Sequence, residues 1–273
     1  MSRIDERFAE LRAEGRKPLI LFIEAGDPDL ATTKVLLPAL EAAGADLIEL
    51  GVPFSDPLAD GPTIQLAALR ALKSGTTLKK ILEMVEEVRP QVGVPLILMS
   101  SYNPIFVFGE EAFVKSAVEV GVDGLIVPDL PPEEADSLVA LTEREGLDLI
   151  FLLAPSSTDD RIALVAKRSR GFIYYISLMG ITGARRELAD TISEHVGRIK
   201  TVTDRPVAVG FGISTPEQAR DVATWSDGVV VGSALVKLIE AGGSPDALCE
   251  SVGSFVRDMK AGVLEATGSD RSA

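Results

Sequence analysis

The chain has 273 residues, of which 46% are hydrophobic and 25% are charged, a composition typical of a globular protein large enough to bury its own core. Acidic residues (41) outnumber basic residues (27), and the resulting net charge of −14 disfavours binding to nucleic acid or to an anionic membrane surface. A single cysteine, Cys249, and a single histidine, His195, exclude an internal disulfide and any metal site built from several such side chains.

The N-terminal segment and the overall patterning bear on location and domain number. Residues 1–7 carry charges where a secretion signal needs an apolar run, and no run of 18 apolar residues occurs. We therefore expect a cytoplasmic protein without a transmembrane helix. No linker or low-complexity segment divides the chain, so one domain over residues 1–273 is predicted, with a capping helix over 1–14 and a flexible tail over 268–273.

Short apolar runs alternate with longer amphipathic segments along the whole chain. The runs are almost continuously apolar, which is typical of strands buried on both faces of a parallel sheet. Eight strands are predicted, at Leu19–Ala25, Asp46–Leu50, Pro95–Ser100, Gly124–Val127, Asp148–Leu153, Phe172–Ser177, Pro206–Gly210 and Gly228–Val231.

The segments between these strands show apolar residues at helical spacing. Helices are predicted at Ser2–Glu14, Lys34–Ala43, Leu78–Arg89, Glu110–Val120, Pro132–Glu145, Asp159–Arg170, Glu187–Lys200, Thr215–Ala223 and Ala247–Ala261. Eight strand–helix units predict a single α/β domain, a (β/α)8 or TIM barrel with an extra N-terminal helix. A doubly wound open sheet shares the alternation, but the count of eight and the glycines after the last two strands favour the barrel.

Two connections are longer than ordinary strand-to-helix loops. They cover Gly51–Thr63 and Leu178–Arg186, and each leaves the carboxyl end of a predicted strand. Active sites of barrels lie at that end. Both segments are therefore predicted to be mobile lids over a site.

Carboxylates are the leading candidates for chemistry in a chain with so few histidines and cysteines. Glu49 lies near the carboxyl end of a buried strand, where burial raises the pKa of a carboxyl toward working pH and suits it to general acid–base catalysis. The alternative is a salt-bridged structural residue. Asp60, in the first long connection, is placed to accept a hydrogen bond from a substrate N–H and to stabilise positive charge; its alternative is a helix cap.

Glycines after the last two predicted strands indicate an anion site. Gly210-Phe211-Gly212-Ile213-Ser214 follows one strand and Gly232-Ser233-Ala234 follows the next. Backbone N–H groups at such turns, with a helix N-terminus behind them, bind phosphate, and barrels often hold phosphate there. Thr182-Gly183, in the second lid, is placed to close over the same anion. No dinucleotide or Walker fingerprint occurs.

We expect structural roles for the single histidine, the single cysteine and several aromatic residues. His195 is predicted to be a surface residue and Cys249 to pack on the last helix. Trp225 and the pair Tyr174-Tyr175 are expected in the core, with strand alternation directing one tyrosine of the pair into the barrel lumen.

Several motifs taken together resemble the tryptophan synthase alpha chain family. The longest is Leu47–Gln65, LIELGVPFSDPLADGPTIQ, and the matches cover about residues 15–260. The others are Ala25-Gly26-Asp27-Pro28, Val127–Pro131 (VPDLP), Leu153–Thr158 (LAPSST), Gly180-Ile181-Thr182-Gly183, Gly210–Ile213 (GFGI) and Gly232-Ser233-Ala234.

This resemblance implies a carbon–carbon lyase that splits indole-3-glycerol phosphate into indole and D-glyceraldehyde 3-phosphate, without a metal or an organic cofactor. It implies Glu49 as the general acid and base and Asp60 as the residue that holds the indole N–H. The remaining substrate-binding residues that it implies are Phe22, Tyr174 and Phe211 around the indole and Thr182, Gly183, Gly212, Gly232 and Ser233 around the phosphate.

The resemblance also implies a partner, a beta chain that carries pyridoxal phosphate and receives indole through a tunnel for L-tryptophan synthesis, in an α2β2 assembly. Residues 53–56 and Tyr102-Asn103-Pro104 would form the docking edge.

Three positions depart from the family pattern. Glu24 stands where threonine is common, and its neighbouring strand carries Glu49, so a coupled carboxyl pair is predicted. Ser101 replaces a common aromatic residue, and Met179 places an apolar side chain in the second lid. These departures keep three alternatives open: a stand-alone lyase, a non-catalytic barrel that activates its partner, and another sugar-phosphate enzyme on the same fold.

Overall fold

The computed structural model describes residues 1–57, 60–176, 185–210 and 212–268. Nine strands in these residues form one sheet in which every neighbouring pair runs parallel. They are β1 (Leu19–Glu24), β2 (Leu47–Gly51), β3 (Leu96–Met99), β4 (Gly124–Ile126), β5 (Asp148–Ile150), β6 (Leu152–Leu153), β7 (Ile173–Ile176), β8 (Val207–Gly210) and β9 (Gly228–Val231).

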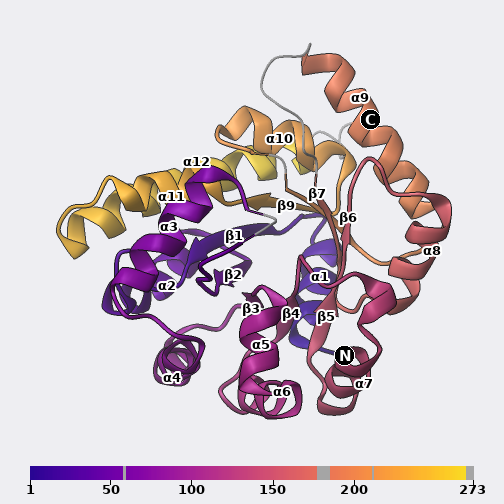
Figure 1. Cartoon of the computed structure of the whole chain (residues 1–273). Helices are drawn as coiled ribbons and strands as arrows, with labels where there is room; N and C mark the ends of the chain where they lie inside the picture. The colour runs from indigo at the N-terminus through magenta and orange to yellow at the C-terminus, as the bar shows by residue number, and fades with distance from the viewer. Residues whose placement is uncertain (58–59, 177–184, 211, 269–273) are drawn as a thin grey trace.

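The order of the strands shows that the sheet is a barrel. The order is β5-β4-β3-β2-β1-β9-β8-β7-β6, so β5 and β6 are its two edges. Only Phe151 separates these strands in the chain, and its backbone N–H donates to Ser169 Oγ at 3.1 Å instead of continuing the ladder. The two edges therefore meet, β5 and β6 together are the predicted strand Asp148–Leu153, and the open-sheet alternative is wrong. Figure 1 shows the strands at the centre with helices around them.

Twelve α-helices of the described residues surround or close the barrel. They are α1 (Arg3–Ala13), α2 (Leu30–Ala43), α3 (Pro62–Lys73), α4 (Leu78–Val88), α5 (Tyr102–Phe108), α6 (Glu110–Glu119), α7 (Asp136–Glu145), α8 (Asp159–Arg168), α9 (Arg185–Lys200), α10 (Pro216–Trp225), α11 (Ser233–Glu240) and α12 (Pro245–Gly268). Two short 3₁₀ turns cover Arg89–Gln91 and Pro132–Glu134.

The helices differ from their predictions mainly at their ends. α2 begins four residues early because the Asp29 side chain caps it by accepting from Thr32 N–H at 2.7 Å. α12 continues to Gly268, so the predicted tail does not begin there; residues 269–273 lie outside the described part. Helices α3, α5 and α11 lie outside the predicted helix ranges. Helices α5 and α11 are short, with seven and eight residues, whereas α3 was expected only as the helix that Asp60 would cap.

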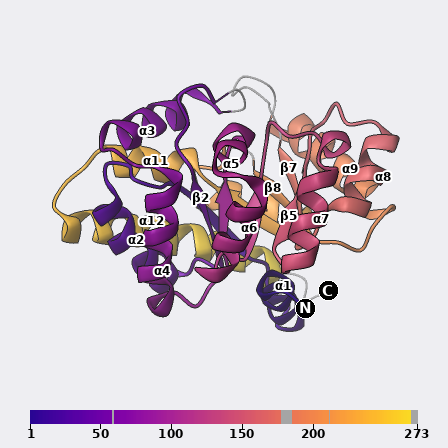
Figure 2. The same cartoon turned by 60° about the horizontal axis from the view of Figure 1, so that its bottom comes forward.

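Alternation along the strands creates two separate apolar cores. Side chains facing outward pack against the helices, whereas inward-facing ones such as Ile20, Leu47 and Phe172 fill the barrel lumen. Helix α1 closes one end of this lumen, where Ile4 and Phe8 join the inner core. Figure 2 shows α1 at that end, against the amino ends of the strands.

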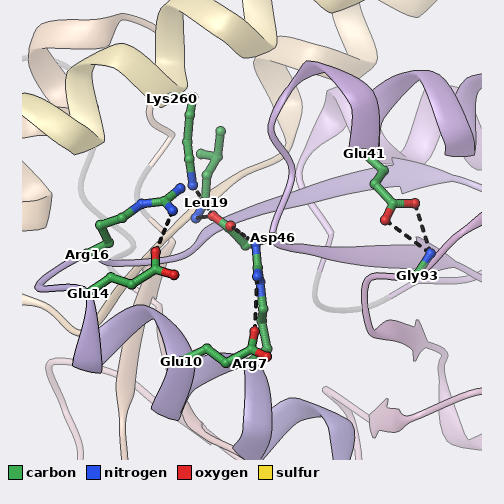
Figure 3. A network of polar contacts seen from close by, with 9 residues as sticks. All are labelled: Arg7, Glu10, Glu14, Arg16, Leu19, Glu41, Asp46, Gly93 and Lys260. Carbon is green, nitrogen blue, oxygen red and sulfur yellow. Dashed lines mark hydrogen bonds and ion pairs between the residues drawn. The ribbon is translucent and has the colours of Figure 1, made fainter.

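A network of charges holds the same closed end together. Asp46, which precedes β2 and is 1% exposed, accepts from Leu19 N–H at 2.7 Å and from Arg7 Nη2 at 2.6 Å, and it also binds Lys260 of α12. Figure 3 shows these partners converging on Asp46, with Glu41 accepting from Gly93 N–H nearby. The carboxylate thereby connects two strands, α1 and α12.

The same device recurs around the closed end. Asp123, before β4, accepts from Leu96 N–H of β3 at 2.9 Å, and Asp227, before β9, accepts from Val207 N–H of β8 at 2.9 Å. Each also has a basic partner, Arg89 for the first and Lys200 for the second. In each case, a carboxylate satisfies the first N–H of the preceding strand, which the sheet leaves free.

None of the helices in the described residues combines the length and the apolar character that crossing a membrane requires.

Candidate active site

A cavity opens at the carboxyl ends of β1 to β4, opposite the end closed by α1. The residues that line it come from β1, from the connection after β2, from α3 and from the ends of β3 and β4: Phe22, Glu24, Gly51, Val52, Phe54, Pro57, Asp60, Ala68, Met99, Ser100, Ser101, Pro128 and Asp129. The first predicted lid thus supplies one wall of the cavity.

Glu49 lies in the lumen beside this cavity, two residues before Gly51 on the same face of β2. It pairs in register with Phe22 of β1 and with Ile97 of β3, and its side chain is 0% exposed. Neither carboxyl oxygen has a hydrogen-bond partner in the described residues, so the salt-bridge alternative fails. Burial alone raises the pKa of Glu49 to about 8. A carboxyl with this pKa is mostly protonated near pH 7 and can still ionise there, so it can both donate and accept a proton.

The tyrosine pair separates across β7 as strand alternation predicts. Tyr174 points into the lumen with the inner core, and burial together with the charge of Glu49 raises its pKa. Tyr175 points outward, where its hydroxyl lies 2.7 Å from His195 Nδ1 on α9. His195 lies at the surface on α9, as predicted, but its side chain is half-buried against Tyr175 and not fully exposed. Cys249 packs on α12, as predicted.

Asp60 directly precedes Gly61, the N-cap residue of α3. The α3 N-cap has no side-chain hydrogen bond, so the helix-cap alternative for Asp60 is wrong. Its side chain lines the cavity, while its backbone carbonyl accepts from Gln65 Nε2 at 2.8 Å. Burial and the nearby charge of Asp129 raise the pKa of Asp60.

Glu24 adds a further carboxyl to the cavity. It is 3% exposed, pairs with Gly51 in register, and projects on the same side of β1 as Phe22. Burial and the charges of Asp60 and Asp27 raise its pKa well above the ordinary range. The predicted coupling of Glu24 with Glu49 is wrong, because the charges that act on Glu24 are those of Asp60 and Asp27.

The predicted anion-binding glycines lie at the ends of adjacent strands. Gly210 ends β8 in register with Val230 of β9, and Gly212 follows with a φ of +59°, a conformation that favours glycine. Gly232 is the N-cap of α11 and has no side-chain cap, and Ser233 is the first residue of that helix. The first N–H groups of α11 have no helical acceptor, so they are available to an anion.

Several predicted positions lie outside the described residues. They are Phe211 of the indole group, Thr182 and Gly183 of the phosphate group, and Met179, so the second lid is described only from Arg185, where α9 begins.

Asp129 is not among the site residues predicted from the sequence, although it lies within the motif Val127–Pro131. The structure places Asp129 in the cavity wall, where one carboxyl oxygen accepts from Tyr102 N–H at 2.8 Å and so connects the ends of β4 and β3. A carboxylate in the short segment that follows the carboxyl end of β4 was the signal that could have found it.

The fold and the cavity define a class: a (β/α)8-barrel enzyme with buried carboxyls at the carboxyl ends of its strands. Comparison with known proteins narrows this class. The family model of the tryptophan synthase alpha chain matches residues 8–263. The alpha chain of Geotalea uraniireducens is 57% identical over 98% of this chain and 100% of its own length, and that of Geobacter sp. is 56% identical over 97% and 99%.

Solved structures agree. The tryptophan synthase alpha subunit of Legionella pneumophila superposes with a TM-score of 0.89 at 38% identity, covering 97% of this chain and 99% of its own. A chain of tryptophan synthase from M. tuberculosis gives a TM-score of 0.87 at 38% identity, covering 96% and 100%. The chain belongs to the tryptophan synthase alpha chain family.

Proposed function

We propose that the chain is the lyase of this family, which cleaves indole-3-glycerol phosphate to indole and D-glyceraldehyde 3-phosphate with Glu49 as the acid–base group and Asp60 at the indole nitrogen. One observation carries the assignment: Glu49 is fully buried beside the cavity, and neither of its carboxyl oxygens has a partner in the described residues. This burial raises the pKa of Glu49 to about 8.

Glu49 serves two proton transfers in this proposal. Its neutral acid protonates C3 of the indole ring, which places positive charge on the ring nitrogen. The resulting carboxylate then removes the proton from the hydroxyl on the carbon attached to C3. That carbon becomes an aldehyde, the C–C bond breaks, and its electron pair returns to the ring, which releases neutral indole. Glu49 ends in its starting state, so protons balance over one turnover.

Asp60 and Phe22 form the part of the site that binds the indole ring. Phe22 is 6% exposed and lines the cavity with Asp60, which gives an aromatic wall next to a carboxylate. The carboxylate accepts from the indole N–H and stabilises the charge that develops there after C3 is protonated. Tyr174, whose pKa responds to Glu49, completes the lumen side of the ring.

The N-terminus of α11 provides the phosphate end. A Cβ atom at Gly232 would contact the Cβ of Phe22 at 3.4 Å, so this glycine lies directly next to the aromatic wall. Backbone N–H groups from Ser233 onward and the turn at Gly212 bind the phosphate. Thr182 and Gly183 complete that site, and Phe211 completes the indole pocket, as the family resemblance implies.

A beta chain is the proposed partner, in an α2β2 assembly that forwards indole. The docking edge is residues 53–56 with Tyr102, Asn103 and Pro104. Exposed apolar side chains support an interface there: on α5, Phe106 is 65% exposed and Val107 is 76% exposed. Within the proposed edge, Ser55, Asp56 and Asn103 are exposed, whereas Pro53 is buried and shapes the edge from beneath.

The proposed reaction needs no metal or cofactor, because Glu49 carries out both proton transfers. It donates a proton to C3 of the indole ring and accepts one from the hydroxyl group of the substrate. The single cysteine, which can form no disulfide within the chain, supports a cytoplasmic location.

The decisive experiment measures indole release from indole-3-glycerol phosphate by the purified chain, with and without a beta chain. We expect slow release alone and much faster release with the partner. Equal, fast release in both conditions would instead identify a stand-alone lyase. Absence of indole in both conditions would contradict the proposal, and stimulation of the partner by an inactive chain would identify a non-catalytic activator.

A further inference from the structure

Glu24 lines the cavity together with Asp60 and Asp129, and the reaction proposed above assigns no role to its carboxyl group. Its side chain is 3% exposed, and its Oε1 has no hydrogen-bond partner in the described residues. A Cβ atom at Gly51 would overlap the other oxygen, Oε2, so the absence of a side chain at position 51 makes room for this carboxyl. The threonine that is common at this position in the family would need no such space.

The groups around Glu24 are negative or already paired. Asp60 faces it from the connection after β2, and Asp27 follows it on the connection after β1. Arg70 of α3 is the nearby cation, but its guanidinium is committed to Asp27 through bonds of 2.7 and 2.8 Å and to Glu240 of α11 at 2.8 Å.

The other titratable groups near Glu24 bring no further cation. Glu49 precedes Gly51 by two residues on β2, and Asp129 faces Asp60 from the end of β4. With no free cation among these described neighbours, the neutral acid is the stable form of Glu24, and its pKa is raised accordingly.

A neutral carboxyl offers both a carbonyl acceptor and an O–H donor. We propose that Glu24, as a neutral acid, accepts through its carbonyl oxygen from the N–H of the bound ring, sharing that N–H with Asp60 in a three-centre hydrogen bond, and that its deprotonation at alkaline pH weakens ligand binding. This inference rests on the proposed function, because that function supplies the ring.

The pH effect follows from dehydration of the cavity. A bound ring displaces the water that would solvate a carboxylate. One carboxylate, Asp60, is balanced by the N–H of the ring. A second one, on Glu24, would lie unsolvated next to it, and that arrangement is costly. Ligand therefore binds the neutral form of Glu24 and is lost as this form disappears.

The test measures binding of indole-3-glycerol phosphate by calorimetry from pH 7 to 9.5 in a Glu49→Gln background, which removes both turnover and the titration of Glu49. Glu24→Thr should bind about five- to tenfold more weakly at pH 7, as expected for one lost hydrogen bond. The reference should lose up to about tenfold in affinity per pH unit once Glu24 ionises. Glu24→Gln should bind within about threefold of the reference at pH 7 and lose that slope.

Equal affinity of the threonine variant and the reference at pH 7 would overturn the contact. A flat reference profile, or a slope that persists in Glu24→Gln, would overturn the pH effect. Glu86→Gln makes the same chemical change on the exposed face of α4 and serves as the control for altered charge. Failure of the reference itself to bind the ligand would count against the proposed function, so the two failures are distinguishable.

A second measurement covers the case in which a double variant does not fold. In the otherwise unchanged chain, Glu24→Gln should flatten the alkaline rise of KM while the alkaline behaviour of kcat, which Glu49 governs, is retained. An unchanged KM profile would overturn the proposal.

Discussion

Asp46 and Glu49, at opposite ends of the barrel, are equally buried, but they differ in whether their carboxyl oxygens have partners. At the amino ends of the strands, Asp46 is 1% exposed, and a backbone N–H, Arg7 and Lys260 satisfy it. At the carboxyl ends, Glu49 is 0% exposed, and neither of its oxygens has a partner in the described residues. The presence or absence of partners therefore determines what each carboxyl group does. Asp46 stabilises the fold. Burial of Glu49 without partners in the described part of the chain costs free energy and raises its pKa, which suits this carboxyl to proton transfer.

The largest expected effect concerns catalysis at the carboxyl end. Glu49→Gln should lower turnover by about 10² to 10⁴, because the amide can neither donate nor accept the transferred proton. Indole release under single-turnover conditions measures this change, and circular dichroism confirms that the barrel is intact. A variant with full activity would remove Glu49 from the mechanism.

The reciprocal change at the closed end should affect folding instead. Asp46→Asn should reduce the free energy of unfolding by about 3–5 kcal/mol, because it leaves Lys260 and Arg7 without their buried counter-charge. Urea denaturation measures the loss, and turnover per folded molecule should stay near that of the unchanged chain. A loss below about 1 kcal/mol would mean that water replaces the carboxylate and that the comparison between the two ends does not hold.

The pH dependence of stability should show the cost of Glu49 directly. Its pKa is about 8 in the folded chain against an ordinary value of 4.5, so between these values the folded state retains a proton that the unfolded state has lost. The free energy of unfolding should therefore decrease as pH rises through this window, by up to about 1.4 kcal/mol per pH unit.

Glu49→Gln isolates this contribution, since the amide does not titrate. The difference in unfolding free energy between the variant and the unchanged chain should increase from about pH 4.5 to about pH 8 in the variant's favour and then level off. A constant difference across that range would show that Glu49 is ionised in the folded chain.

The smallest expected effect tests whether the burial of a carboxylate at the closed end determines how much it contributes to the free energy of unfolding. Asp227→Asn should cost only about 1 kcal/mol or less, because the side chains of Asp227 and Lys200 are 28% and 33% exposed and the amide oxygen can still accept from Val207 N–H. Urea denaturation at low and high salt measures it. A loss as large as that of Asp46→Asn would mean that position around the barrel, and not burial, sets the contribution.

Predictions from the sequence succeeded where the residue pattern of one strand was enough to decide which side chains are buried and which way they face. Continuous apolar runs such as Leu19–Ala25 predicted parallel, doubly buried strands, and the position of Glu49 in one of them predicted its burial and its raised pKa. Alternation likewise predicted that Tyr174 and Tyr175 would face opposite sides. The motif around Asp60 identified the family, as the comparisons confirm.

Predictions failed where the answer depends on which residues meet across the fold. Glu24 was expected to couple with Glu49 because the two lie on adjacent strands, but the carboxyls that act on Glu24 are Asp60 and Asp27, from two loops. The contact of His195 with Tyr175 was not predicted, because nothing local shows that this side chain reaches β7. Helix α5 was missed because seven residues carry too little periodic signal.

The sequence by itself determined the family, the barrel of parallel strands and the buried position of Glu49, because side-chain spacing along one segment dictates which of its faces is buried. Only the tertiary structure decided which buried carboxyls have partners. Asp46 meets Lys260, 214 positions further along the chain, whereas Glu49 and Glu24 meet no cation in the described residues. Pairing, and with it the division between stabilising and chemically active carboxyls, depends on contacts between segments that the folded barrel brings together.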